Sequence, residues 1–394
     1  MISLATAHQL LSQHARHWGN EIVWLDEAVG RVLAEPVLAD RDYPPFNRAT
    51  MDGIAIRYED WQRGIRKYRV KETLFAGTTP HEEIEEGACY RIMTGAAVPD
   101  SADTVIRKED ITVHGQAIVI AESPIQRGQY IAIKGNDAVA GSTLVPPPFH
   151  IKAGTITTLA SLGFAEVKVA RLPSVAILTT GNEIVPVDTE PAPTQIRNSN
   201  AHLLNALLAQ WKIRPVIIKH LPDEPEKMLQ AVKQLLHLDV LILSGAVSAG
   251  DADYVPQVLE KAGIEKVFHK LAIRPGKPAW FGEKAGGPVV FALPGNPYST
   301  FVTFHLLIDV YLRSCWKIAP ATPLQLPFEG SRSKNSELDE FFPVILKGNP
   351  THASAVPFNN SGDITAMLRA DAMGWHPAAQ RMIKEGMTVG CYSV

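Results

Sequence analysis

The chain has 394 residues, which is enough for roughly two to four domains. Hydrophobic residues make up 46% of it, and 38 basic residues are balanced by 41 acidic ones, for a formal net charge of −3. A sizeable core is therefore available, and the charge balance argues against a general nucleic-acid-binding protein.

The three cysteines, Cys89, Cys315 and Cys391, are far apart and lack the spacing of metal ligands. The N-terminal segment lacks the pattern of a secretory signal, and no stretch approaches the ~20 apolar residues of a membrane span. We therefore expect a cytoplasmic protein that binds neither nucleic acid nor membranes.

The first half of the chain predicts three segments. Residues 3–46 favour a helix followed by an extended stretch, and residues 47–134 have the short alternating runs and turns of a small β-rich domain. A Gly/Pro-rich boundary at 135–150 precedes a helical stretch at 150–164. On spacing alone, Asp52 and Thr94 are interpreted as turn residues of the β-rich segment.

From Val175 onward the pattern becomes strand, polar loop and helix, repeated. Helices are predicted at 201–211 and 227–238 from apolar residues at helical spacing. Short apolar strands alternating with such helices predict a parallel sheet covered on both faces, with ligands beyond the carboxyl ends of the strands. The predicted strands are 175–178, 215–218, 240–243 and 289–293.

A Pro-rich linker at 318–327 separates the last unit of the chain. Alternating residues and turns in that unit predict a small β-barrel or sandwich.

The corner Pro294-Gly295-Asn296-Pro297 follows the last predicted strand. Asn is favoured as an N-cap and Pro at the first helical position, so we expect Asn296 to cap a helix that begins at Pro297. Outward-facing N–H groups at such a corner suit an anion. A tight turn without a ligand is the alternative, and for this corner alone it is the better interpretation.

Two other loops follow predicted strands with small residues and carboxylates. Small residues allow a ligand to approach the backbone, and several such loops at one sheet edge indicate a metal-assisted phosphate site, whereas each loop alone is more often a plain turn. The residues are Gly181, Glu183, Ser244, Gly245, Ser248, Gly250, Asp251 and Asp253.

The segment 270–282 places Lys270, Arg274 and Lys277 around a Pro-Gly turn. Cations at this density indicate a polyanionic ligand. A solvated hairpin tip is the alternative, although Pro275 and Pro278 fix where the charges point.

Eight ordered segments resemble the motifs of molybdopterin molybdenumtransferases, the MoeA-type enzymes and the corresponding domain of gephyrin. They are AVGRVLAEPV, FNRATMDGIAIR, RIMTGAAVPDSADTVIRKED, VAILTTGNEI, IRNSNAHLL, LILSGAVSAGDADYV, AIRPGKPAWFG and ALPGNPYSTFVTFHL. SGDITAMLRADA also resembles the last domain of that family. The resemblance covers nearly the whole chain, and the ordered set is far more specific than any single motif.

The resemblance implies a multidomain α/β fold. Its parts would be an extended linker domain (3–46 with 135–172), a small β-rich domain (47–134), a central parallel-sheet α/β domain of the molybdopterin-binding type (173–318) and a C-terminal β-barrel-like domain (325–394). It also implies a homodimer with a site shared between subunits, and transient contact with other proteins of molybdenum cofactor biosynthesis.

The implied activity is insertion of molybdenum from molybdate into adenylylated molybdopterin, with release of AMP and with Mg²⁺. Both substrates are anions, so their site needs fixed cations, helix N-termini and a metal that bridges phosphates.

Matching the motifs residue by residue assigns roles. The implied catalytic residues are Asp52, Thr94, Glu183, Asp223 and Asp253, and the implied metal ligands are Glu183, Asp251 and Asp253. Asp52 and Thr94 would act in the site of the partner subunit. The implied substrate-binding residues are Gly181, Ser244, Gly245, Ser248, Gly250, Lys270, Arg274, Lys277, Pro294, Gly295, Asn296, Pro297 and Asp137.

The chain departs from the family pattern at several positions. Asn182 and Asn198 stand where members often have Asp, and losing two carboxylates weakens the metal site or retunes it. Arg274 stands for the usual Lys and keeps the charge with a forked geometry. The other departures are Ile54, Ala246 and Ala249.

The sequence leaves two other functions possible. A molybdopterin adenylyltransferase shares the central type of domain, but such enzymes lack a counterpart of residues 1–172. A scaffold of the gephyrin type is the second, and the retained Glu183, Asp251 and Asp253 favour chemistry over it.

Overall fold

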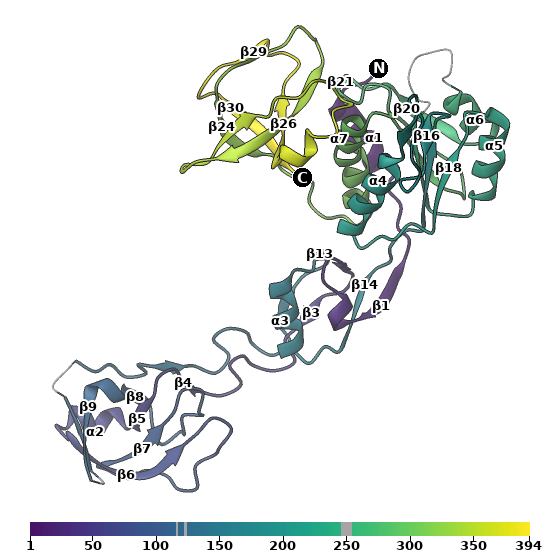
Figure 1. Cartoon of the computed structure of the whole chain (residues 1–394). Coiled ribbons are helices and arrows are strands. Elements are labelled where there is room, and N and C mark those ends of the chain that lie inside the picture. Colours follow the sequence, from purple (N-terminus) through teal and green to yellow (C-terminus); the bar gives the residue numbers. More distant parts are fainter. Residues whose placement is uncertain (116, 122–123, 246–253) are drawn as a thin grey trace. The chain divides into compact units, whose positions relative to one another are not determined.

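The structure is a computed structural model that describes residues 1–115, 117–121, 124–245 and 254–394 (Figure 1). The chain divides into two compact units, the first with residues 1–34, 148–156 and 165–394, the second with residues 35–147 and 157–164. Helix α3 (Ala153–Ser161) is divided between them. No helix in the described ranges is long and apolar enough to cross a membrane.

The first unit contains a six-stranded sheet in the order β18-β15-β19-β23-β22-β20. Strands β18 (Ile217–Leu221), β15 (Val175–Thr180), β19 (Val240–Ser244) and β23 (Val289–Leu293) are parallel, which confirms the predicted parallel sheet. Strands β22 (Trp280–Glu283) and β20 (Glu265–His269) extend it antiparallel. The sequence did not predict these two, because the cations and prolines between them indicate a turn.

Both faces of this sheet are buried. In β15, Val175 and Ile177 pack into a core with helices α1 (Leu4–Gln13), α4 (Ser199–Gln210), α7 (Pro297–Thr303) and α8 (Asp309–Cys315). Ala176 and Leu178 pack on the opposite face, with α5 (Pro225–Gln234) and α6 (Val255–Lys261). Burial on both faces is why the central strands β15, β19 and β23 are so apolar, whereas the edge strand β18 is exposed at residues 218–220.

Two local predictions were inaccurate. Strand β18 begins at Ile217 rather than 215, because Pro215 has no N–H to donate to the sheet. The single helix predicted after Pro297 contains a π-helical turn, Phe304–Ile308, between α7 and α8. Apolar periodicity alone does not reveal such a turn.

A small antiparallel sheet precedes the central one in the first unit. It has the order β1-β14-β2-β13. Its strands are β1 (Asn20–Trp24), β14 (Glu166–Ala170), β2 (Val32–Leu33) and β13 (Phe149–His150).

The C-terminal strands form the predicted barrel. The order β26-β27-β24-β30-β28 closes into five strands because β28 also pairs with β26. Strand β21 (Ile273–Arg274) pairs in parallel with β26 and places Arg274 opposite Glu340, which joins the barrel to the α/β part. The barrel strands are β24 (Leu324–Glu329), β26 (Asp339–Lys347), β27 (His352–Ala355), β28 (Ala372–His376) and β30 (Thr388–Ser393), flanked by the pair β25 (Arg332–Ser333) and β29 (Met382–Ile383).

The second unit is β-rich, as its alternating sequence predicts. Its main sheet has the order β8-β5-β7-β6-β10-β9 and carries helix α2 (Tyr58–Gln62). The strands are β5 (Gly53–Ile56), β6 (Lys67–Leu74), β7 (Ala88–Ile92), β8 (Thr104–Arg107), β9 (Ile111–His114) and β10 (Ala117–Ile120). Two short pairs complete it, β4 (Arg48–Ala49) with β11 (Ile131–Ala132) and β3 (Val37–Leu38) with β12 (Thr143–Val145).

Candidate active site

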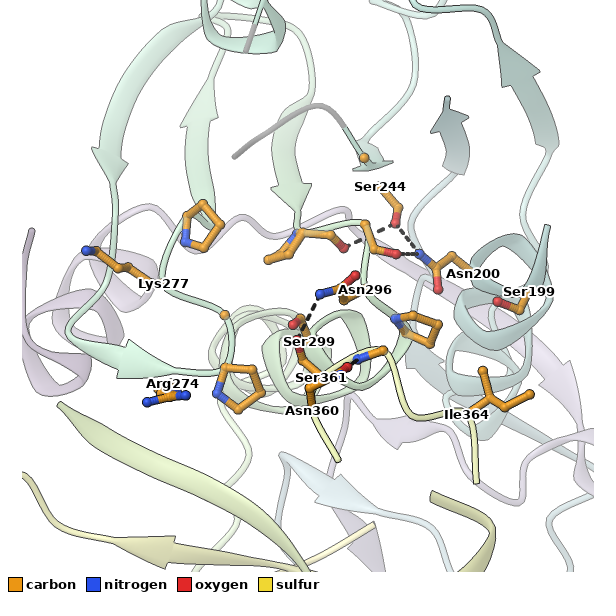
Figure 2. Close-up of a pocket in the computed structure, with 18 of the residues that line it drawn as sticks. Ser199, Asn200, Ser244, Arg274, Lys277, Asn296, Ser299, Asn360, Ser361 and Ile364 are labelled. Carbon is orange, nitrogen blue, oxygen red and sulfur yellow. Dashed lines mark hydrogen bonds between the residues drawn. The ribbon is translucent and has the colours of Figure 1, made fainter. Parts of the chain in front are cut away.

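A cavity of about 1590 Å³ lies in the first unit, at the carboxyl ends of the parallel strands. The loops after β15, β19 and β23 and the segment 273–278 form one part of its wall, and the barrel contributes residues from 332–341 and 358–364. In Figure 2, Arg274 and Lys277 lie on one side of it, and Ser199 and Asn200 on the other.

The cavity gathers eleven of the residues named from the sequence. They are Gly181, Glu183, Asp223, Ser244, Gly245, Arg274, Lys277, Pro294, Gly295, Asn296 and Pro297. Within the described part of the chain, Lys270 does not line the cavity. Asp52, Thr94 and Asp137 belong to the second unit. Ser248, Gly250, Asp251 and Asp253, with Ala246 and Ala249, lie outside the described residues.

Two strand-end glycines give this wall its close backbone packing. Gly245 has φ +108°, and a Cβ there would lie 2.6 Å from the Thr180 carbonyl oxygen. At Gly181, with φ +141°, a Cβ would lie 2.8 Å from Oε1 of Glu183. The positive φ favours glycine at both positions, and at Gly245 the Thr180 backbone also leaves no room for a Cβ, whereas the Glu183 side chain next to Gly181 can move.

Asp223 is tied to the neighbouring loop. Its Oδ2 accepts from the Asn182 N–H (3.1 Å), its own N–H donates to Oδ1 of Asn182 (3.1 Å), and its Oδ1 accepts from the Tyr254 hydroxyl (2.9 Å). Burial and the Asp223 carboxylate together raise the pKa of Tyr254, which therefore stays a hydrogen-bond donor. Both Asp223 oxygens therefore accept hydrogen bonds, whereas within the described ranges the Glu183 carboxylate has no hydrogen-bond partner.

Asn200 connects two of the cavity loops, and the sequence alone did not identify it as a site residue. Its Nδ2 donates to Oγ of Ser244 (2.9 Å) and to the carbonyl of Gly295 (2.7 Å). The carbonyl can only accept, so the amide orientation is fixed. The partners are distant in the chain, and the only available signal was the IRNSN motif itself.

Asn198, one of the departures from the family pattern, has two partners of its own. Its Oδ1 accepts from the Ala201 N–H (3.2 Å) at the start of α4, and its Nδ2 donates to Oγ1 of Thr179 (2.8 Å). A carboxylate could cap the helix but could not donate to Thr179. Asparagine is therefore suited to this wall of the cavity.

The Pro294–Pro297 corner is the strand-to-helix turn that the sequence predicts, and α7 begins at Pro297 with Asn296 as N-cap. The Asn296 side chain does not cap the helix; its Nδ2 donates to Oγ of Ser361 (2.9 Å). The Tyr298 N–H donates to the Ser361 carbonyl (3.0 Å). The barrel loop around Ser361 thus occupies an N–H group that the sequence interpretation assigned to an anion.

The barrel wall carries a charged network that sequence reasoning also missed. Arg332 donates to Oε2 of Glu340 (2.7 Å) and to Nδ1 of His376 (2.8 Å). Arg274 lies 3.9 Å from Oε1 of the same Glu340. Burial, with Arg332 and Lys334 close by, lowers the pKa of His376 to about 4, so the ring is neutral and accepts from Arg332.

In the second unit, Asp52 and Thr94 are directly bonded. The backbone N–H and the hydroxyl of Thr94 both donate to Oδ1 of Asp52, each at 2.8 Å. Oδ2 lies 3.8 Å from the Lys108 ammonium. The Thr94 hydrogen bonds, followed by Lys108, lower the pKa of Asp52, which is a carboxylate at neutral pH. Asp137 is exposed, with its backbone N–H bonded to the Tyr43 carbonyl (2.8 Å).

The described residues contain no group of three or more His, Cys, Asp or Glu side chains placed to hold a metal ion. Glu183 and Asp223 supply carboxylate oxygens, the type of ligand that Mg²⁺ takes. They suit part of a Mg²⁺ site.

Comparison with known proteins identifies the fold and the family. Residues 2–163 match the family described as "MoeA N-terminal region (domain I and II)", and residues 176–314 match "Probable molybdopterin binding domain". A molybdopterin biosynthesis MoeA protein from Pyrococcus horikoshii has a similar structure, with a TM-score of 0.85, 26% identity and 100% of both chains covered.

Curated relatives match over most of the chain. A molybdopterin molybdenumtransferase of Synechocystis sp. is 32% identical over 98% of both chains. One of Bacillus subtilis is 31% identical over 94% of this chain and 88% of its own. With its motifs, two-sided α/β sheet and closed barrel, the chain belongs to the molybdopterin molybdenumtransferase family of molybdenum cofactor biosynthesis enzymes.

Proposed function

We propose that this protein transfers molybdenum from molybdate to adenylylated molybdopterin and releases AMP. One observation carries the proposal: a single cavity gathers Arg274, Lys277 and Glu183 at the carboxyl ends of the parallel strands, in a chain of this family. The cavity is large enough for a nucleotide-sized ligand.

The proposed reaction balances without an oxidant or reductant. Molybdenum loses two oxygens as water and gains two bonds to the dithiolene sulfurs, at the oxidation state that it has in molybdate. One water cleaves the bond between the two phosphates, which leaves molybdopterin phosphate and AMP. Forming two waters takes four protons: the two dithiolene thiols give up two as the sulfurs bind molybdenum, and cleavage of the diphosphate releases the other two. Net, one water is formed.

The chain's own contribution to this reaction is electrostatic. Lys277 and Arg274 would neutralise the diphosphate and molybdate, which repel each other in water. Gly181 and Gly245 would set the course of the two loops that face the phosphates, because their positive φ angles favour glycine. Ser244, whose Oγ accepts from Asn200, would hold in place the strand end that faces the ligand.

We propose Mg²⁺ as the metal, held by Glu183 with Asp251 and Asp253, which follow Ser244 and Gly245 in the chain. When bound, Mg²⁺ withdraws charge from the phosphate oxygens. Glu183 supports this assignment, since its carboxylate lies against the backbone of Gly181 at the cavity wall.

We also propose a homodimer in which Asp52 and Thr94 act in the site of the partner subunit. The hydrogen-bonded Asp52–Thr94 pair supports a role beyond a turn, because it holds an ionised carboxylate partly exposed.

The test is an assay with adenylylated molybdopterin, molybdate and Mg²⁺, in which AMP and inserted molybdenum are measured together. We expect both to appear in equal amounts. An adenylyltransferase would instead form the adenylylated pterin from ATP, and a scaffold would do neither. AMP release without molybdenum insertion would contradict the proposal.

A further inference from the structure

Lys334 is a buried ammonium in the wall of the cavity. The residue is 6% exposed and lines the cavity from the barrel, directly after β25. Lysine is almost never this deeply buried unless it is paired, because removing its charge from water is costly.

The bonds of Lys334 do not neutralise it. Its Nζ donates to the carbonyls of Leu338 (2.6 Å) and His376 (3.3 Å), so one of three protons remains for another acceptor. No carboxylate of the described residues lies within 4.0 Å of this Nζ. Burial, helped by Arg332 and Arg381, lowers the pKa of the Lys334 ammonium against the opposing effect of Glu340 and Asp339.

The carboxylate of Glu340, near Lys334, already has cationic partners. Glu340 bonds Arg332 at 2.7 Å and lies 3.9 Å from Arg274, so two guanidinium groups share this carboxylate. The other partner of Arg332, His376, is a neutral acceptor. With Asp339, the other carboxylate near Lys334, the groups Arg274, Arg332, Lys334, Glu340 and Asp339 include one more positive than negative charge.

We propose that Lys334 binds a tetrahedral oxyanion at the barrel wall of the cavity. The proposal rests on the proposed function, which brings two such groups into the cavity: molybdate and the phosphates of the adenylylated pterin. An anion there would accept the remaining Lys334 proton and match the excess charge. The alternative is that Lys334 only closes the turn between residues 334 and 338.

The test replaces Lys334 in two ways. Lys334→Met keeps the aliphatic stem, and Lys334→Gln keeps a donor for the two carbonyls while removing the charge. Two control variants change residues of the same barrel or the same turn as Lys334. Lys384→Met removes an exposed charge from the same barrel, and Ser336→Ala removes the hydroxyl that accepts from the Leu338 N–H (3.0 Å) in the same turn.

The readouts are KM for molybdate and KM for the adenylylated pterin, each with the other substrate saturating. We expect both Lys334 variants to raise one KM about tenfold, as for loss of a hydrogen bond to a charged group, with less than twofold change in the controls. A rise in KM for molybdate alone would identify molybdate as the bound anion. A rise in KM for the adenylylated pterin alone would identify one of its phosphates. Unchanged KM values, or the same losses in Ser336→Ala, would overturn the proposal.

Calorimetric titration with molybdate or AMP, neither requiring turnover, separates this inference from the proposed function. If wild type binds molybdate or AMP at least about tenfold more tightly than Lys334→Gln but releases no AMP in the assay, the subsite stands and the proposed reaction fails. Equal binding of both ligands by wild type and Lys334→Gln overturns the subsite.

Discussion

Asp52 shows how strongly the charge state of a carboxyl group depends on its hydrogen-bond partners. In the sequence it precedes a glycine and is typical of a turn. In the structure one of its oxygens accepts two hydrogen bonds from Thr94, and these are the main reason that its pKa is lowered. A carboxylate stabilised in this way keeps its charge in mildly acidic solution.

We predict that Thr94→Val raises the pKa of Asp52, because the hydroxyl donor is lost while the backbone N–H remains. Carboxyl-carbon NMR titration of the full chain measures this directly. Thr94→Ser keeps a hydroxyl and should titrate like wild type. An unchanged Asp52 pKa in Thr94→Val would mean that the hydroxyl has no influence on the charge.

Single residues of the cavity wall were predictable only where a motif carried them. Gly181, Glu183 and Gly245 could be named because each follows a recognisable strand. Asn200 and Lys334 could not, because their meaning depends on partners such as Gly295 and His376 that are distant in the chain. Composition and periodicity carry no information on such pairings.

At the scale of elements, the strand-to-loop junction after β19 depends on Gly245. We predict that Gly245→Ala lowers the free energy of unfolding by about 2–4 kcal/mol, from positive-φ strain plus a clash with the Thr180 carbonyl. Gly286→Ala is the matched control, because Gly286 also has positive φ, +65°, but has open space at the Cβ position. Urea unfolding of both variants measures the difference, and equal losses would show that the clash is relieved without cost.

The barrel should lose stability in acid through His376. Its pKa is about 4 in the folded protein, below the ordinary value of 6.5, so the unfolded chain binds the proton first. Stability is therefore complete above pH 6.5 and falls as the pH drops from 6.5 to 4, by up to roughly 3 kcal/mol. We predict that His376→Gln, which can still accept from Arg332, removes this part of the pH dependence.

Urea unfolding monitored by tryptophan fluorescence, at several pH values between 4 and 7, compares this variant with wild type. Other histidines with lowered pKa, such as His305, remain in both proteins, so the difference between the two curves isolates His376. If the free energy of unfolding depends on pH in the same way in both proteins, His376 is not the group responsible.

The parallel strands of the α/β part followed from sequence because the central ones, β15, β19 and β23, are buried on both faces and almost continuously apolar. Strands β20 and β22 could not be predicted from the sequence, because the cations and prolines between them indicate a turn. The barrel's closure through β26 and β28 and its attachment through β21 are long-range pairings. Alternation predicts that strands exist but does not specify which strands pair.

At the scale of the whole molecule, the proposed shared site makes a prediction about mixed dimers. Asp52→Ala removes an acid of the second unit, and Glu183→Gln removes one of the first. If a site takes Asp52 from one subunit and Glu183 from the other, each variant homodimer has two defective sites. A mixed dimer of the two variants has one site with both defects and one site with neither.

Random exchange of equal amounts gives about half mixed dimers, each with one intact site, so the mixture should recover about one quarter of wild-type AMP release. The measurement requires subunit exchange verified by two affinity tags. Mixing Asp52→Ala with Thr94→Ala, two defects of the same unit, is the control and should recover nothing. No recovery in verified mixed dimers would place the acids of each site within one subunit, because separate defects in different chains could then never leave a complete set of charges around one ligand.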